Sequence, residues 1–199
     1  AVVANQPEIL PADFAALDEQ QQITALMTCE GIADASVSDD PVIRDTIESM
    51  SVISRIQQSN GERGAHRYII SNCRGAVDVA RVMALLRLCG ADRRHDAISV
   101  DIVPLFETVS DLQGGGASMT SLYQNAAYLN HIAQRRRRQT VMLGFSDGTK
   151  DGGYLMANWA IYSAKETITA VSRAAGIEVM FFDGRGGPPA RGGGDTYLF

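Results

Sequence analysis

From residue 66 onward, short apolar runs typical of strands alternate with longer stretches that have the period of a helix. The strand candidates are RYIIS (67–71), AISVDIVPLF (97–106), TVMLGF (140–145) and IEVMFF (177–182), and the helix candidates are residues 77–90, 121–136 and 153–176. Three of these strands are apolar over several consecutive residues, which is typical of a parallel sheet covered on both faces. The repeat therefore predicts an α/β fold and leaves both a doubly wound sheet and a (β/α) barrel open.

The first 60 residues have the pattern of helices and loops. We expect one helix over residues 11–27, with Pro11 in its first turn, and a second from Pro41 to Gln58, which the run SNGERGA at 59–65 ends. A Gly-rich turn is expected between the second strand and the helix at 121–136. Residues 1–64 are thus predicted to form a helical lead-in segment.

Composition narrows the classes of partner. A net charge of −5 argues against general binding of nucleic acid or of a membrane surface, and no apolar run approaches the length of a bilayer span. Three cysteines without a CxxC pair suit reduced thiols, so we expect a cytoplasmic protein. The run Arg135–Arg138 is interpreted as the solvated C-terminus of a helix, on the face opposite the site, rather than as a nucleic-acid patch.

Charged residues follow three of the predicted strands. Glu107 comes after the second strand, Asp147, Lys150 and Asp151 after the third, and Asp183, Arg185 and Arg191 after the fourth. Because the carboxyl ends of parallel strands meet on one face, we expect these groups to gather there. No nucleotide-binding fingerprint of the G-x-G-x-x-G or Walker A type accompanies them.

The residue types suit a metal ion and an anion. Glu107 and Asp147 offer hard oxygen ligands for Mg²⁺ or Mn²⁺. Lys150, Arg185 and Arg191 are cations for phosphate or carboxylate, and the glycines around each arginine allow close backbone approach. Two alternatives stay open: a strand-end carboxylate is often a helix cap or a surface charge, and a Gly-Arg run can be a flexible RNA-binding tail.

Three segments resemble the phosphoenolpyruvate carboxylase family: VPLFETVSDL (103–112), VMLGFSDGTKDGGYLMANWAIYSAKE (141–166) and FFDGRGGPPARGGG (181–194). HRYIISNCRGAVDVARVMALL (66–86) is a weaker match, and the resemblance runs from about Ile47 to the end of the chain. It implies a (β/α)8 barrel of TIM type, of which residues 65–199 would form about half. The chain would then be an internal fragment of a much longer enzyme, itself a homo-oligomer, by resemblance a tetramer.

The resemblance also implies roles for individual residues. Glu107 and Asp147 would bind the divalent metal, Lys150 would help position bicarbonate or substrate, Arg185 with Gly186 and Gly187 would bind the phosphoryl group, and Arg191 would steady the carboxylating species. The implied reaction turns phosphoenolpyruvate and bicarbonate into oxaloacetate and phosphate, through carboxyphosphate and a metal-bound enolate.

Two departures from the family pattern bear on activity. Asp183 stands where the family usually has histidine, so a role in orienting Arg185 or Arg191 through a salt bridge is expected for it. The family's catalytic histidine and its further arginines have no counterpart here, so we expect this chain alone to be inactive. Two other functions remain open: another Mg²⁺-dependent barrel enzyme acting on phosphoenolpyruvate or pyruvate, and a non-catalytic relative with a degenerated site.

Overall fold

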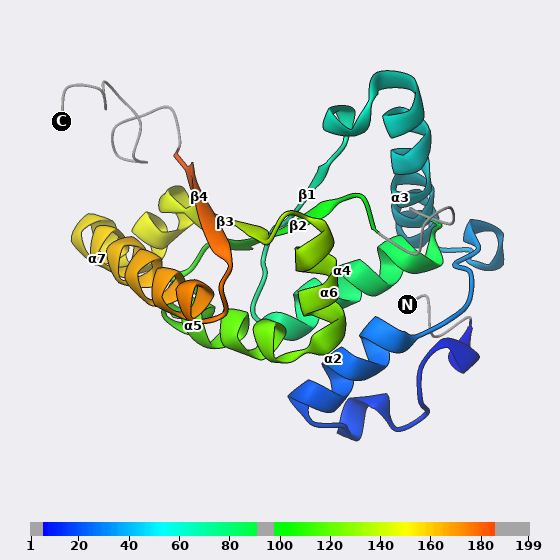
Figure 1. Cartoon of the computed structure of the whole chain (residues 1–199), viewed down its shortest axis with the longest axis horizontal. Helices are drawn as coiled ribbons and strands as arrows, with labels where there is room; N and C mark the ends of the chain where they lie inside the picture. The colour runs from blue at the N-terminus through cyan, green and yellow to red at the C-terminus, as the bar shows by residue number, and fades with distance from the viewer. Residues whose placement is uncertain (1–5, 91–97, 186–199) are drawn as a thin grey trace.

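Four parallel strands form one sheet in the computed structural model, which describes residues 6–90 and 98–185 (Figure 1). They are β1 (Arg67–Ile70), β2 (Asp101–Phe106), β3 (Arg138–Gly144) and β4 (Glu178–Gly184), hydrogen-bonded in the order β1-β2-β3-β4. All three pairings are parallel. The predicted α/β class with four parallel strands is confirmed, and each strand overlaps its predicted segment.

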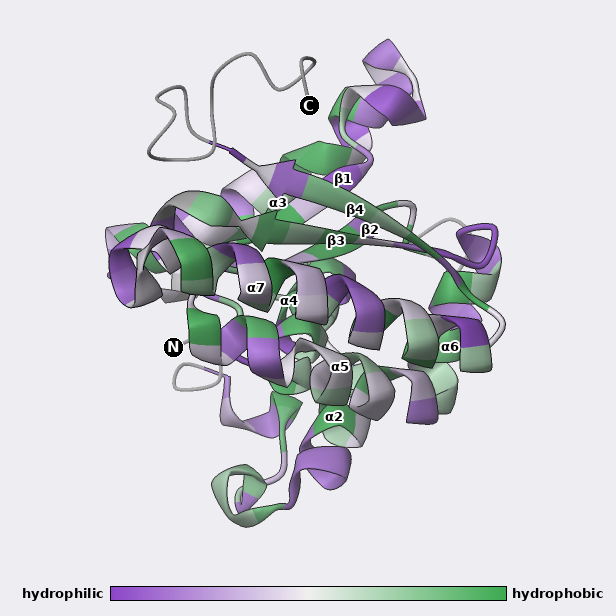
Figure 2. Ribbon diagram, turned by 90° about the vertical axis from the view of Figure 1, so that its left-hand side faces the viewer, coloured by the Kyte–Doolittle hydropathy of each residue, from purple (hydrophilic) through white to green (hydrophobic). Residues whose placement is uncertain are grey.

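The helices of eight residues or more in the described part of the chain are α2 (Glu19–Thr28), α3 (Pro41–Asn60), α4 (Ala76–Leu88), α5 (Val109–Gln124), α6 (Ala126–Gln134) and α7 (Phe145–Ala174). Figure 2 shows α4 to α7 on one side of the sheet. We expected both faces of the sheet to be covered. Two apolar strand side chains are nevertheless open to solvent, because Ile69 on β1 is 49% exposed and Phe182 on β4 is 55% exposed. Strands in sequential order with helices on one side differ from a doubly wound sheet, which carries helices on both faces.

The first long helix begins later than its predicted start near Pro11. Asp18 is its N-cap, and its carboxylate accepts a 2.8 Å hydrogen bond from the backbone N–H of Gln21. The side chain of Gln21 in turn accepts from the backbone N–H of Asp18 at 3.0 Å, which completes a capping box. The D-x-x-Q signal of this box is a stronger start than the proline, so α2 begins at Glu19.

The expected Gly-rich turn after β2 is wrong, because α5 runs through Gly114, Gly115 and Gly116. A Cβ atom at Gly115 would lie 3.1 Å from Ile168 Cδ1 and 3.3 Å from the Phe106 ring. One at Gly116 would lie 3.2 Å from Thr167 Cβ. These glycines therefore let α5 pack closely against α7, and two helices, α5 and α6, connect β2 to β3 where one was predicted.

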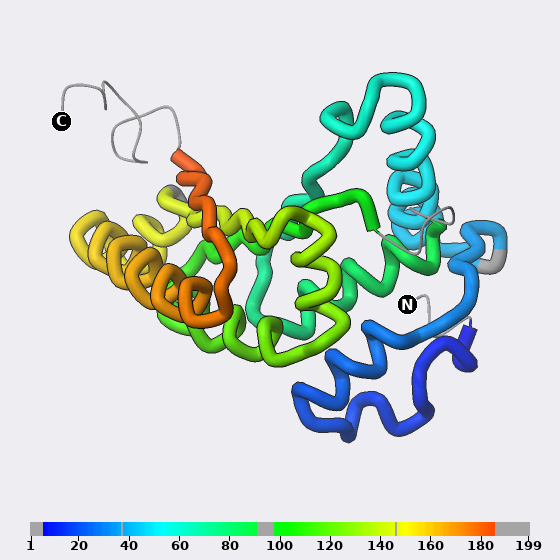
Figure 3. Tube along the Cα trace, in the orientation of Figure 1, coloured from blue at the N-terminus to red at the C-terminus, as the bar shows by residue number. Residues whose placement is uncertain are grey.

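The lead-in segment packs on the βα units. Figure 3 shows residues 6–60 gathered at one end of the molecule, beside α4, with α7 at the other end. Ile23 of α2 and Met50 of α3 belong to the same hydrophobic cluster as Leu86 of α4. The backbone N–H of Ala33 donates to the carbonyl of Leu88 at 2.9 Å. The division into domains at residue 64 stays a prediction.

The Arg135–Arg138 run lies at the amino end of the strands, as predicted, but it is not simply a solvated helix end. Arg135 forms ion pairs with Asp101 at 2.6 Å and Glu62 at 2.7 Å, and its side chain is only 15% exposed. Arg137 donates to the carbonyls of Ala175 and Gly176 at 2.9 Å each, just past the end of α7. Arg135 and Arg137 therefore stabilise the loops and strand starts at the amino end of the sheet.

Candidate active site

The segments that follow the four strands contact one another at the carboxyl edge of the sheet. The backbone N–H of Asn72, after β1, donates to Glu107 Oε2, after β2, at 3.3 Å. The backbone N–H of Val109 donates to Asp151 Oδ2, after β3, at 3.0 Å. The guanidinium of Arg185, after β4, lies 5.7 Å from the centre of the Phe145 ring. The charged groups that follow three different strands therefore share one edge of the sheet.

Glu107 is held where β2 and β3 end close together. It is the first residue after β2, and Thr108 after it is the N-cap of α5, with a capping box completed by Asp111. A Cβ atom at Gly144 would lie 3.0 Å from Glu107 Cα and 3.2 Å from Glu107 Cγ, closer than ordinary packing allows. Glycine at the end of β3 thus permits the backbone of Glu107 to pass at this distance.

Asp147 and Lys150 lie in the first turns of α7. This stretch was expected to be a loop, but the helix begins at Phe145 and contains one non-helical residue, Gly153, with φ +78°. Lys150 Nζ is 2.8 Å from Asp147 Oδ1, and the two side chains are 67% and 51% exposed. An acidic residue in a first helical turn is favoured by the helix dipole, so the sequence stabilises this turn while both charges stay accessible.

The two carboxylates fit the expected metal in type and number. Mg²⁺ commonly binds through one or two protein carboxylates and keeps waters and substrate oxygens as its other ligands. Glu107 and Asp147 supply two such groups from neighbouring strand ends. Within residues 6–90 and 98–185, no three His, Cys, Asp or Glu side chains cluster in a way that could hold a metal ion. A cage made of protein ligands alone is therefore not built into this part of the chain.

Asp183 forms ion pairs with two cations. Its carboxylate is 2.8 Å (Oδ1) and 3.1 Å (Oδ2) from Nζ of Lys165, a residue in the middle of α7 that the sequence reasoning missed. Arg185 Nη2 lies 3.5 Å from Asp183 Oδ2, so the expected salt bridge with Arg185 is present. The backbone N–H of Arg185 also donates to the carbonyl of Asp183 at 3.0 Å. Arg191, Gly186 and Gly187 lie outside the described residues.

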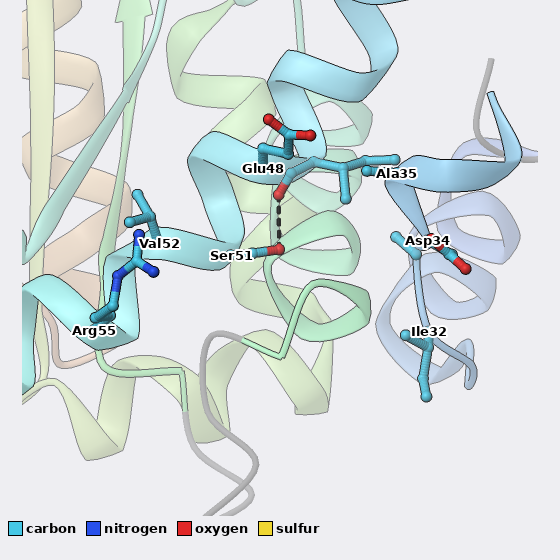
Figure 4. Close-up of a pocket in the computed structure, with 9 residues that line it drawn as sticks. Ile32, Asp34, Ala35, Glu48, Ser51, Val52 and Arg55 are labelled. Atoms are coloured by element: carbon cyan, nitrogen blue, oxygen red, sulfur yellow. Dashed lines mark hydrogen bonds between the residues drawn. The ribbon is translucent and has the colours of Figure 1, made fainter. Parts of the chain in front are cut away.

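Two hollows lie away from this edge. The first, of about 590 Å³, lies between α3 and residues 32–35, and Figure 4 shows Glu48, Ser51 and Arg55 of α3 around it. The Ser51 hydroxyl donates to the Ile47 carbonyl at 2.7 Å. The second, of about 570 Å³, is mainly apolar and is lined by residues of the lead-in segment and α4. Neither contains a predicted site residue.

Comparisons with known proteins agree with the resemblance and extend it. A family model described as phosphoenolpyruvate carboxylase matches residues 1–198, so the match also includes the lead-in segment. The phosphoenolpyruvate carboxylase of Parasynechococcus marenigrum (strain WH8102) is 35% identical over 197 residues, which cover 94% of this chain and 20% of the relative. That of Mycobacterium leprae (strain TN) is 36% identical over 192 residues, or 93% of this chain and 21% of the relative. One from Corynebacterium glutamicum (strain ATCC 13032) is 42% identical over 140 residues, which cover 69% of this chain and 15% of the relative. The chain therefore spans about a fifth of the length of the relatives that match nearly all of it.

Proposed function

The chain belongs to the phosphoenolpyruvate carboxylase family, and from that premise we propose that the protein containing it carboxylates phosphoenolpyruvate with bicarbonate. The products would be oxaloacetate and phosphate. The observation that carries this proposal is the gathering of Glu107, Asp147, Lys150 and Arg185 at one sheet edge, although they follow three different strands. Two carboxylates and two cations suit a divalent metal and an anionic substrate.

The sheet supports a partial barrel as the scaffold. Strands in sequential order, with α4 to α7 on one side, are the arrangement of consecutive units in a (β/α)8 barrel. We propose that residues 65–199 form about half of such a barrel and that residues 1–64 lead into it. Further βα units would cover Phe182 and the open edge of β4, which a closed barrel does not leave exposed.

The residues have distinct proposed tasks. Glu107 and Asp147 would hold Mg²⁺ or Mn²⁺, which when bound would stabilise negative charge on the enolate oxygen. Arg185, with Gly186 and Gly187 beside it, would bind the phosphoryl group of phosphoenolpyruvate, with the bidentate geometry that a guanidinium allows. Lys150 would hold bicarbonate or the substrate carboxylate as a point charge, and Arg191 would steady the carboxylating species.

The proposed reaction places negative charge where these cations lie. Bicarbonate oxygen attacks the phosphorus of phosphoenolpyruvate, and the enolate leaves, giving carboxyphosphate. Carboxyphosphate then breaks into phosphate and carbon dioxide, and the enolate carbon attacks carbon dioxide to form oxaloacetate. Cations already held in place stabilise the charge on the transferring phosphoryl group without reorganising during the reaction.

We also propose that this chain supplies only part of the site. Since it spans about a fifth of its relatives' length, groups from the rest of a longer protein would complete the phosphate clamp, and the 199-residue chain alone would not turn over. The whole protein would be a cytoplasmic homotetramer. Among the described residues, none of the helices combines the length and apolar character needed to span a bilayer.

The experiment uses the full-length protein that contains this chain. Oxaloacetate formation is followed with phosphoenolpyruvate, Mn²⁺ and bicarbonate, and Mn²⁺ binding is measured separately by electron paramagnetic resonance. Glu107→Gln and Asp147→Asn should each weaken Mn²⁺ binding at least tenfold and lower turnover. Glu178→Gln is the matched control, because Glu178 is an exposed carboxylate at the amino end of β4.

Three outcomes would contradict the proposal. Turnover of phosphoenolpyruvate that does not depend on bicarbonate would favour another barrel enzyme acting on this substrate. Absence of both turnover and Mn²⁺ binding in the wild-type protein would favour a non-catalytic relative. Unchanged Mn²⁺ affinity in both carboxylate variants would show that the metal site lies elsewhere.

A further inference from the structure

Lys165 and Lys150 are the only two lysines in the chain, which has sixteen arginines, and both are in α7. Lys150 lies in the exposed first turns of the helix, whereas Lys165 lies fifteen residues further on, with a side chain 35% exposed. Helix side chains tilt toward the N-terminus of their helix, and the N-terminus of α7 is at the carboxyl edge of the sheet. A long side chain in the middle of α7 can therefore reach that edge.

The alternation of β4 directs Asp183 toward α7. Val179 and Phe181 pack against the hydrophobic core on the helix side, whereas Phe182 is exposed on the other side. Asp183 is two residues after Phe181 and so shares its side. Lys165 Nζ lies 6.0 Å from the centre of the Phe181 ring and 2.8 Å from Asp183 Oδ1. The Asp183 carboxylate is thus turned toward α7 and its lysine.

Charge explains why such a partner is needed. Asp183 puts a negative charge 3.5 Å from Arg185, and a carboxylate there competes with any anion that the guanidinium binds. Lys165 is the nearer of the two cations, and it contacts both carboxylate oxygens. Together the three side chains carry one net positive charge, whereas Asp183 and Arg185 without the lysine would carry none.

We propose that Lys165 is a positioning residue that acts through Asp183 to keep Arg185 competent to bind an anion. Lys165 holds the Asp183 carboxylate on the α7 side at 2.8 Å, so that this carboxylate orients Arg185 through the longer 3.5 Å contact and competes less strongly with the anion. The inference rests on the proposed function in one respect, namely that the anion at Arg185 is the phosphoryl group of phosphoenolpyruvate. The pairing itself requires only that Arg185 binds an anion.

The kinetic test is a double-mutant cycle in the full-length protein. Lys165→Gln keeps a hydrogen-bond donor but removes the charge, and should raise the KM for phosphoenolpyruvate about tenfold with kcat changed less than threefold. In an Asp183→Asn background the same substitution should change KM less than twofold, because no carboxylate remains to be neutralised. Lys165→Arg, which keeps charge and donors, should behave like the wild-type protein.

A second measurement does not need turnover. Labelling of Arg185 by phenylglyoxal, resolved by peptide mass spectrometry, should be at least threefold slower in Lys165→Gln, because the released carboxylate then engages the guanidinium. The rate should return to that of the wild-type protein when Asp183→Asn is added.

The two measurements separate the possible failures. A KM effect of equal size in both backgrounds, or labelling unchanged by Lys165→Gln, overturns the positioning role. A wild-type protein without carboxylase activity that still shows the labelling pattern keeps the positioning role and refutes the proposed function.

Discussion

The two ends of the same four strands use charge in opposite ways. At the amino end, Arg135 is paired with Asp101 and Glu62, and Arg137 donates to carbonyls after α7. At the carboxyl end, Asp147 and Lys150 pair only within one helical turn and are more than half exposed. In parallel βα units every helix ends where the next strand begins and starts where the previous strand ends. Carbonyl oxygens therefore collect at the amino end, where those of Ala175 and Gly176 accept hydrogen bonds from Arg137, while the carboxyl end has the helix N-termini and leaves Asp147 and Lys150 exposed to ligands.

The largest difference between the two ends should appear when Lys150 is replaced by Met in the full-length protein. We expect carboxylation of phosphoenolpyruvate to fall by about 10²–10³-fold, the size typical for loss of a group that stabilises transition-state charge. The free energy of unfolding should change by less than about 0.5 kcal/mol, since exposed ion pairs contribute little. Oxaloacetate assays and chemical denaturation measure the two effects. A stable variant with nearly normal activity would show that this accessible charge is not part of the site.

Lowering the pH should destabilise the amino end of the sheet through His131. This histidine belongs to α6 and is only 4% exposed. Burial, aided by the charge of Arg135, lowers the pKa of His131 from 6.5 to about 4. The unfolded chain binds this proton as the pH falls through 6.5, while the folded protein resists it until near pH 4. The free energy of unfolding should therefore fall across that window, by up to about 3 kcal/mol from this group.

His131→Leu should remove this part of the pH dependence, whatever it does to stability at neutral pH. The measurement compares denaturation curves of the wild-type protein and the variant at intervals from pH 7 to pH 4. Identical slopes for the two proteins would mean that the histidine gains its proton as easily in the folded state as in the unfolded one.

A smaller effect is expected from the arginines at the amino end. Arg135→Met leaves Asp101, whose side chain is 23% exposed, without its nearest cation, and should lower the free energy of unfolding by about 2 kcal/mol. Arg138→Met is the matched control, because the Arg138–Glu178 pair is exposed and should contribute less than about 0.5 kcal/mol. Catalytic constants should be unchanged in both. Equal stability of the two variants would mean that burial does not distinguish these pairs.

The sequence predicted the presence of helices and strands better than the residues at which they begin and end. Apolar runs located all four strands, because two central strands buried on nearly every residue need continuous hydrophobic sequence. The segment Gly114–Gly116 was wrongly predicted to be a turn, because glycine has a low helix propensity. Only the structure shows that Gly115 lies within α5 and is needed there for close packing. The start of α7 was also predicted eight residues late, because the glycines at 148, 152 and 153 resemble a loop.

The candidate site was predictable where residues follow strands directly. Glu107, Asp147 and Arg185 could be assigned to one edge from their positions alone. Lys165 could not, because it lies in a regular helix whose sequence gives no sign that its ammonium group reaches β4. The register of α7 against β4 decides that contact, and the register depends on packing rather than on local sequence.

The pairing of Lys165 with Asp183 also constrains how this protein can evolve. A change of Asp183 to histidine would leave Lys165 facing a group with no compensating negative charge, and a change of Lys165 alone would leave the Asp183 carboxylate without its nearer cation. Each single step is therefore disfavoured, and the two positions should have been inherited as a unit. Relatives with histidine at the position of Asp183 should also lack lysine at the position of Lys165. The two positions, eighteen residues apart in the sequence, should therefore covary.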